Sequence, residues 1–350
     1  AMTVRIGIIA NPVSARDIRR VISHAAGLTL GERANMLLRI LQALAACKVD
    51  EVLLMPEMEG LRLHLERQLP AAAEESRYPL PRLRWLDMPV RTKTEDSVRA
   101  AEIMRREGVA ALLVLGGDGT HRAVVKGCRD IPIAGISTGT NNAFPPMREV
   151  TVTAWAAGLY AAGRVPDEHA LRPNKCLHIR TFGSDGLEKQ NDVALIDAAV
   201  LNEAILGAKA ISQTDTLRTV ISTQASIEAV GLSAVAAALQ PVGRHDAGGL
   251  LIELAPTYGT HEPAAKTFTI QAVLSPGKVE DIEIASFRRF KAGEEYRVSG
   301  QNCLIALDGE REIALRDNEY ALISLQENAF YTLDVPAVLK YVCAQKLHEV

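Results

Sequence analysis

The first half of the chain alternates short, nearly continuous apolar runs with longer segments in which apolar residues recur every three or four positions. The runs predict strands and the periodic segments predict helices. In chain order, the predicted strands cover 4–10, 51–55, 83–86, 109–115 and 131–136, and the predicted helices cover 33–46, 60–75, 95–106, 121–128 and 152–162. This alternation is typical of a Rossmann-like parallel sheet with helices on both faces.

The pattern changes after residue 172, where short apolar runs follow one another with turns between them. They predict a β-rich second domain, with strands at 176–182, 193–200, 219–223, 250–254, 267–274, 282–287, 295–298 and 320–325. Residues 336–347 return to helical spacing. The expected fold class is α/β plus β. It has an α/β domain over 1–168, a β-rich domain over 169–333, and a C-terminal helix over 334–350 that packs back on the first domain.

Composition is that of a globular protein large enough for two domains, with 350 residues, 48% hydrophobic residues and a formal net charge of −3. The chain carries no basic block, so nucleic acid is not an expected partner. No apolar run reaches the length of a membrane span. The five cysteines lie far apart, which suits a reducing cytoplasm. The eight histidines show no metal-ligand spacing, and His121 is expected on a helix surface.

Three glycines surround one carboxylate directly after the apolar run 109–115, in the sequence Gly116-Gly117-Asp118-Gly119-Thr120. Backbone without Cβ atoms can approach an anion closely, and the helix that follows adds positive charge at its N-terminus. Asp118 can accept a proton or help to hold Mg²⁺. The same string is also an ordinary turn composition. Its place after a buried strand, where ligands of α/β sheets bind, favours a phosphoryl-transfer site.

A second polar loop follows the next predicted strand and contains Thr138, Gly139, Thr140, Asn141 and Asn142. Consecutive parallel strands usually lie side by side, so we expect the two loops to form one site. The backbone N–H groups of both loops would bind phosphates. The amides of Asn141 and Asn142 both donate and accept hydrogen bonds, which suits a ribose or polyol hydroxyl near the transfer point.

The end of the first predicted strand adds two further candidates. Asn11 begins a turn, and the basic residues that follow it include Arg20. These groups either meet phosphate or an acidic substrate, or they are solvated charges on a helix. No lysine accompanies the glycines in the manner of a Walker motif, so Mg²⁺ is expected to supply much of the neutralising charge.

The two loops resemble the superfamily of NAD kinases and diacylglycerol kinases, and most closely its ATP-NAD kinase branch of the acetoin catabolism protein X type. The spacing from 116–120 to the strand 131–136 is similar to that of NAD kinases, whereas 138–142 is closer to the Gly-Thr-x-Asn-Asp loop of lipid kinases. Asn202-Glu203 resembles an Asn-Glu pair with which NAD kinases bind a nucleotide. The turn Asp308-Gly309-Glu310 resembles one in the β domain of both relatives, which adds Asp308 and Glu310 as candidates.

The resemblance implies an ATP-dependent kinase that uses Mg²⁺, with Asp118 as the catalytic residue and a hydroxyl of NAD or a related small molecule as the acceptor. It also implies that Asn202 and Glu203 close over the nucleotide in a cleft between the domains, and that the protein is a homo-oligomer, a dimer or tetramer. The expected location is cytoplasmic.

Two departures from the relatives keep alternatives open. The apolar segment 229–236 replaces the Thr-Gly-Ser-Thr-Ala-Tyr segment of NAD kinases, and Arg122-Ala123 replaces an Asn and a Glu of lipid kinases. One alternative is a nucleotide-binding accessory or regulatory protein of acetoin catabolism without NAD kinase activity. The other is a kinase of a small polyol, acetoin-related or lipid substrate.

Overall fold

The computed structural model of the chain describes residues 2–12, 28–139, 142–202, 216–255, 266–299 and 302–348. The chain forms two compact units, Ala1–Pro173 with Phe330–Val350 and Asn174–Ala329. It passes from one unit to the other in the strands β6 (Leu171–Phe182) and β16 (Tyr320–Leu333), so the C-terminal segment belongs to the first unit. Each unit has a hydrophobic core of its own.

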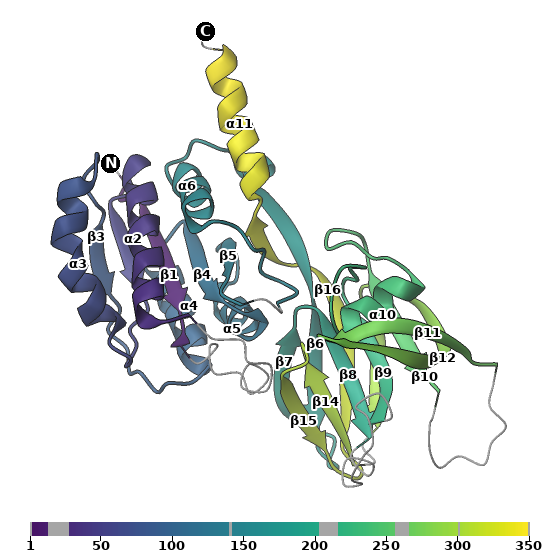
Figure 1. Cartoon of the computed structure of the whole chain (residues 1–350). Helices are drawn as coiled ribbons and strands as arrows, with labels where there is room; N and C mark the ends of the chain where they lie inside the picture. The colour runs from purple at the N-terminus through teal and green to yellow at the C-terminus, as the bar shows by residue number, and fades with distance from the viewer. Residues whose placement is uncertain are drawn as a thin grey trace. The chain divides into compact units, whose positions relative to one another are not determined.

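A parallel sheet forms the centre of the first unit (Figure 1). Its order is β3-β2-β1-β4-β5, with bounds Arg82–Trp85, Glu51–Leu54, Arg5–Ala10, Ala111–Gly116 and Ile133–Ser137. The end of β16 adds a further parallel pair, Thr332 opposite Ile133. The strand order reverses between β1 and β4, and ligands of open α/β sheets bind beyond the carboxyl ends of the strands at such a switch point.

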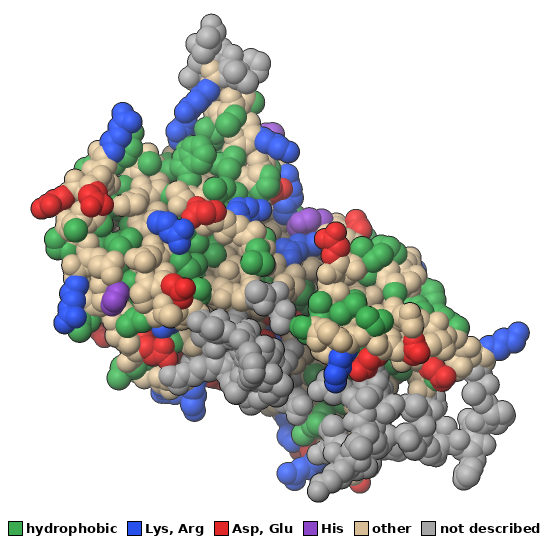
Figure 2. All heavy atoms as spheres, in the orientation of Figure 1, with side chains coloured by type: hydrophobic (Ala, Val, Ile, Leu, Met, Phe, Trp, Pro, Cys, Tyr) green, Lys and Arg blue, Asp and Glu red, His purple; other side chains and the backbone are tan. Residues whose placement is uncertain are grey.

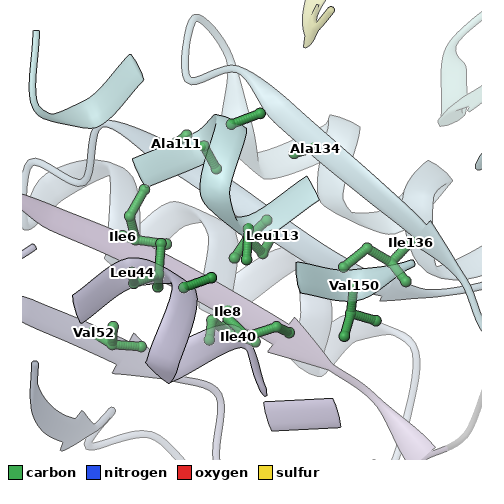
Figure 3. Close-up of a cluster of buried hydrophobic side chains, with 14 of the residues drawn as sticks. Ile6, Ile8, Ile40, Leu44, Val52, Ala111, Leu113, Ala134, Ile136 and Val150 are labelled. Carbon is green, nitrogen blue, oxygen red and sulfur yellow. The ribbon is translucent and has the colours of Figure 1, made fainter. Parts of the chain in front are cut away.

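Helices cover both faces of this sheet. One face packs against α2 (Leu30–Ala46), α3 (Leu61–Glu75), α6 (Val150–Ala161), α7 (Asp167–Ala170) and α11 (Val335–His348). Figure 3 shows part of this core, where Ile6 of β1 lies beside Leu44 of α2 and Ile8 lies beside Ile40 of the same helix. Gly7, between the two isoleucines, faces the other side, where α4 (Glu95–Arg106) and α5 (Asp118–Cys128) lie. A Cβ atom there would come within 2.6 Å of Met104 of α4. The predicted α/β architecture is confirmed.

The C-terminal helix α11 belongs to the core of the first unit, because Val335, Val338 and Val342 are buried in it. Figure 1 draws α11 in yellow beside α6. The expectation that the chain returns to the first domain is therefore confirmed. None of the helices in the described ranges is long and apolar enough to cross a membrane.

A local sequence signal sets the start of α2. The Oγ1 atom of Thr29 accepts the N–H group of Glu32 at 3.2 Å, and the carboxylate of Glu32 accepts the N–H group of Thr29 at 2.6 Å. This capping box satisfies N–H groups that have no partner within the helix. The hydrogen bonds from Thr29 hold the pKa of Glu32 below its usual value.

The second unit is built around a seven-stranded antiparallel sheet with the order β11-β12-β10-β9-β8-β14-β15. The bounds are Phe268–Ser275, Lys278–Phe290, Gly249–Leu254, Leu217–Ser222, Asp197–Asn202, Cys303–Leu307 and Arg311–Leu315. One face packs against α10 (Leu232–Leu239). The other face packs against β7 (Glu188–Ala194), β13 (Glu295–Ser299) and the parts of β6 and β16 in this unit. The predicted β-rich second domain is confirmed.

The predicted strand 193–200 is wrong in one respect, because the structure divides it into β7 and β8. The carboxylate of Asp308 accepts the N–H groups of Leu195 at 3.1 Å, Ile196 at 2.7 Å and Asp197 at 3.2 Å. These groups therefore do not pair with a strand, and the chain turns there. Asp308 follows β14 in a tight turn with left-handed backbone at Asp308 and Gly309 (φ 50° and 69°). The sequence patterns did not predict β14 or β15.

Charged side chains of both signs are interspersed over the face shown in Figure 2. No continuous basic area covers the described residues on this face, in keeping with the formal net charge of −3. Nucleic-acid-binding proteins present such a basic area.

Core packing in the first unit is tested by Leu44→Ala. Leu44 is fully buried, and its truncation removes apolar contacts and leaves a cavity. We expect the free energy of unfolding to fall by about 2–5 kcal/mol, measured by urea denaturation. Leu63→Ala is the matched control, because Leu63 lies on α3 and is 56% exposed. The control should change stability by less than about 0.5 kcal/mol. Equal losses in the two variants would contradict the packing described.

The turn at Asp308 is tested by Asp308→Asn, since asparagine tolerates left-handed backbone but lacks the second acceptor oxygen. We expect a loss of about 1–3 kcal/mol in unfolding free energy, because the amide Nδ2 would face the N–H group of Leu195 and the charge that strengthens the other hydrogen bonds would be lost. Asp317→Asn, an exposed position in the turn before β16, should change stability by less than about 0.5 kcal/mol. A wild-type midpoint for Asp308→Asn would show that the carboxylate does not hold the turn.

Candidate functional site

The glycine-rich segment is a tight connection from strand to helix and is shorter than the loop over 116–120 that the sequence predicted. Gly116 is the last residue of β4, Gly117 is the extended N-cap residue (φ −96°, ψ −167°), and α5 begins at Asp118. The prediction placed the start of this helix at 121. The earlier start puts Gly119 and Thr120 in the first turn of α5, where backbone N–H groups have no partner within the helix. Such a helix start can bind an anion.

The first two glycines make room for side chains of the same chain. A Cβ atom on Gly116 would lie 2.7 Å from Thr120, and one on Gly117 would lie 2.6 Å from Oδ1 of Asn142. Both distances are far shorter than van der Waals contact. Thr120 and Asn142 therefore occupy the space that a Cβ atom at either glycine would need. The expected phosphate contacts of the glycine N–H groups remain a prediction.

Asp118 is buried and connects the two predicted loops. Its Oδ2 atom accepts the N–H group of Ala143 at 3.0 Å, and its Oδ1 atom accepts the N–H group of Phe144 at 2.8 Å. Both hydrogen bonds join the start of α5 to the segment after β5. The expected proximity of the segments after β4 and β5 is what the structure shows.

Asn142 connects the same segments in the opposite direction. Its Oδ1 atom accepts the N–H group of Asp118 at 3.3 Å, and its Nδ2 atom donates to Oγ of Ser137 at 3.0 Å. Ser137 in turn donates to the carbonyl of Gly139 at 2.7 Å. The amide that the sequence analysis assigned to a substrate hydroxyl thus holds the backbone of the catalytic candidate in place. Ser137 was not among the predicted site residues, and its position at the end of β5 was the available signal.

His121 is fully buried, so its expected position on the helix surface is wrong. Its Nδ1 atom donates to the carbonyl of Gly117 at 2.8 Å, and its ring lies 5.6 Å from the ring of Phe144. The signal for this was Gly135 in the neighbouring strand β5. A Cβ atom at that position would lie 2.6 Å from Nε2 of His121.

Arg122 is the second buried ionisable residue of α5 that the sequence analysis did not place in the site. It is 5% exposed and lies four residues after Asp118, which is 7% exposed. Residues four apart share one side of a helix. Arginine keeps its charge and is rarely buried without a partner. A cation therefore lies on the same side of α5 as the candidate catalytic carboxylate.

Asn11 lies at the carboxyl end of β1 and is 5% exposed. Its Nδ2 atom donates to the carbonyl of Lys93 at 3.0 Å and to Oγ of Ser97 at 2.9 Å. Ala10 pairs with Leu115, so Asn11 is level with Gly116 at the switch point. The structure thus brings Asn11, Gly116, Asp118 and Asn142 to one edge of the sheet.

The candidates in the second unit lie at opposite ends of one strand pair. Asn202 is opposite Cys303 at one end of the β8–β14 pair, and Leu307, which precedes Asp308, is opposite Ala198 at the other. The described contacts give Asp308 a role in the turn after β7, and Glu310 is exposed beside it. Arg20, Thr140, Asn141 and Glu203 lie outside the described residues, and Thr138 is partly exposed.

The donor set around Asp118 suits a metal ion that arrives with its substrate. Among the described residues, no group of three or more His, Cys, Asp and Glu side chains is placed to hold a metal. Magnesium in phosphoryl-transfer sites uses one or two carboxylates together with substrate phosphates and water. A single carboxylate at the start of α5 fits that arrangement and does not fit a resident site made only of protein ligands.

Comparisons with known proteins agree with the division of the chain. The family model for the ATP-NAD kinase N-terminal domain matches residues 6–165, and the model for the acetoin catabolism protein X C-terminal domain matches residues 175–328. A solved structure of yeast NADH kinase complexed with NADH is similar in fold. The TM-score is 0.53 with 11% sequence identity, over 97% of this chain and 87% of that chain.

A curated relative is similar along almost the whole sequence. Acetoin catabolism protein X of Cupriavidus necator is 47% identical over 336 residues, which cover 96% of this chain and 91% of the relative. This chain, which has an NAD kinase-like fold with Asp118 at the carboxyl end of β4, is thus similar in sequence to acetoin catabolism protein X. Identity at this level over nearly the full length shows that the chain belongs to the acetoin catabolism protein X family.

Proposed function

We propose that this protein is an ATP-dependent kinase that transfers a phosphoryl group to a hydroxyl of NAD or a related small acceptor. The observation that carries the proposal is the position of Asp118. Its carboxylate is buried at the start of α5, at the sheet's switch point, and is held by the N–H groups of Ala143 and Phe144. Phosphoryl transfer needs mainly positioning and charge neutralisation, with a group that accepts the proton of the attacking hydroxyl.

The described residues at the start of α5 and after β5 have distinct roles in this proposal. The N–H groups at the start of α5, in Gly119 and Thr120, bind a phosphate oxygen. Asp118 accepts the acceptor's proton or binds Mg²⁺ that arrives with ATP. Bound Mg²⁺ would neutralise charge on the transferred phosphoryl group. Asn142 and Ser137 keep the backbone of Asp118 in register with the segment after β5.

Two comparisons support a nucleotide as substrate. The first unit matches the ATP-NAD kinase family model, and the yeast protein of similar fold is an NADH kinase that was solved with NADH. Asn202, at the end of β8, remains the candidate for nucleotide binding in the second unit. NAD is therefore the first acceptor to test.

One observation favours a second candidate function, a nucleotide-binding accessory protein of acetoin catabolism without NAD kinase activity. Segment 229–236, which stands in place of a hydroxyl-rich segment of NAD kinases, leads into α10, whose residues 233–237 are buried. The hydroxyl of Ser233 accepts the N–H group of Ser226 at 3.1 Å and is thus engaged within the chain. Calorimetry that detects ATP or NAD binding, with no product from a panel of NAD, polyols, acetoin-related compounds and lipids, would favour this candidate. Turnover of one of the other acceptors would identify a kinase of that substrate.

The role of Asp118 is tested by Asp118→Asn, which keeps the shape of the side chain and removes its charge and basicity. We expect Mg-ATP-dependent turnover to fall at least ~100-fold, the scale of a lost general base. Asp130→Asn is the control, because Asp130 is exposed just beyond the other end of α5. Melting temperatures of both variants report whether the fold is retained. Wild-type turnover in a folded Asp118→Asn protein would remove Asp118 from the mechanism.

The positioning role of Asn142 is tested by Asn142→Ala. The variant loses the hydrogen bonds to the Asp118 backbone and to Ser137, so we expect kcat to fall by roughly tenfold while KM for ATP changes less. Ser137→Ala removes the hydrogen bonds of its hydroxyl with Asn142 and with the carbonyl of Gly139 but keeps the one from Asp118 to Asn142, and should give a smaller loss of kcat. If KM rises and kcat does not change, Asn142 contributes to substrate binding and not to the position of Asp118.

A further inference from the structure

The connection between β3 and α4 presents two basic side chains at the same sheet edge as Asp118. Arg91 and Lys93 are exposed on either side of Thr92, just before α4 begins at Glu95. Sequence analysis did not single them out, because isolated basic residues in a polar loop are usually solvated. In the structure, their segment lies next to Asn11 at the carboxyl end of β1.

Asn11 fixes this connection beside the glycine segment. Its buried side chain donates to the carbonyl of Lys93 at 3.0 Å and to Oγ of Ser97 at 2.9 Å. The pair Ala10 and Leu115 places Asn11 level with Gly116 on the adjacent strand. Adjacent strands are about 4.8 Å apart. The backbone of Lys93 is therefore separated from Gly116, which leads into Asp118, by the side chain of Asn11 and the spacing between β1 and β4.

Asp96 holds the backbone of the connection in one conformation. It is 4% exposed, and its Oδ2 atom accepts the N–H groups of Arg91 at 3.1 Å and Lys93 at 3.3 Å. Between them, Thr92 has left-handed backbone, with φ 55°. A β-branched residue rarely adopts this conformation, which persists where surrounding contacts fix it and is found at ligand-binding segments. The contacts of Asp96 thus fix the backbone of a turn that carries two exposed basic residues.

We infer that Arg91 and Lys93 bind the outer phosphates of a nucleoside triphosphate whose transferred group lies at Asp118. This inference rests on the proposed function and adds the positive charge that the glycine segment itself does not carry. Arginine and lysine both form strong charge-assisted hydrogen bonds with phosphate oxygens.

The test compares the double variant Arg91→Ala/Lys93→Ala with Arg106→Ala in the full chain. Arg106 is an exposed arginine of α4, separated from Lys93 by roughly 20 Å of helix. Calorimetry with inorganic tripolyphosphate, ATP and adenosine measures binding, and Mg-ATP consumption with the acceptor panel measures activity. We expect the double variant to bind tripolyphosphate and ATP at least about tenfold more weakly than wild type, with adenosine binding unchanged. The control should match wild type for all three ligands.

The outcomes separate this inference from the proposed function. If the double variant and the control bind tripolyphosphate and ATP equally well, the assignment of Arg91 and Lys93 is overturned, whereas turnover by wild type still supports a kinase. If wild type binds tripolyphosphate but consumes no ATP, and the double variant no longer binds tripolyphosphate, the phosphate-binding role stands and the kinase proposal fails. If wild type binds neither tripolyphosphate nor ATP, both are overturned.

Discussion

The hydrogen bonds from the backbone of Ala143 and Phe144 to the carboxylate of Asp118 determine the arrangement of the candidate site. A buried carboxylate is unfavourable unless donors surround it, so the segment after β5 has to fold over the start of α5. That fold brings Asn142 against Gly117, where only a glycine leaves room for it. Close packing continues to His121 and Phe144, whose rings fill the space between α5 and β5. One charged group thus dictates the conformation of two segments that are distant in sequence.

The second unit uses the same interaction for a different purpose. Asp308 also precedes a glycine, and its carboxylate also accepts backbone N–H groups from a distant segment, here Leu195 to Asp197. In this case the result is a turn between β7 and β8, inside the framework of the unit. The sequence Asp-Gly alone therefore does not distinguish a carboxylate at a candidate site from one that holds a turn. The difference lies in what surrounds it: a helix start at a switch point for Asp118, and a strand junction for Asp308.

Elements that follow from local periodicity were predictable, and elements that depend on distant contacts were not. Strands such as β4 and helices such as α4 could be predicted because burial of one face imposes a repeat on the sequence. The break between β7 and β8 could not, since the group that causes it is Asp308, more than a hundred residues away. In the site, the sequence indicated that the segments after β4 and β5 meet. It did not indicate that Thr120 and Asn142 occupy the space over the glycines, because glycine leaves the same room for a ligand or a neighbour.

Phosphate binding at this place depends on backbone N–H groups. Thr120 and Asn142 occupy the directions in which Gly116 and Gly117 would carry a Cβ atom, and the N–H groups of Gly119 and Thr120 in the first turn of α5 are candidate donors to an anion. A helix start contributes only partial charge, on the order of half an elementary charge. A triphosphate needs more positive charge than this, and exposed basic residues of a neighbouring segment would add to the charge of Arg122 on α5. The connection before α4, fixed by Asn11 to the level of Gly116, is a segment of the described structure that meets this requirement.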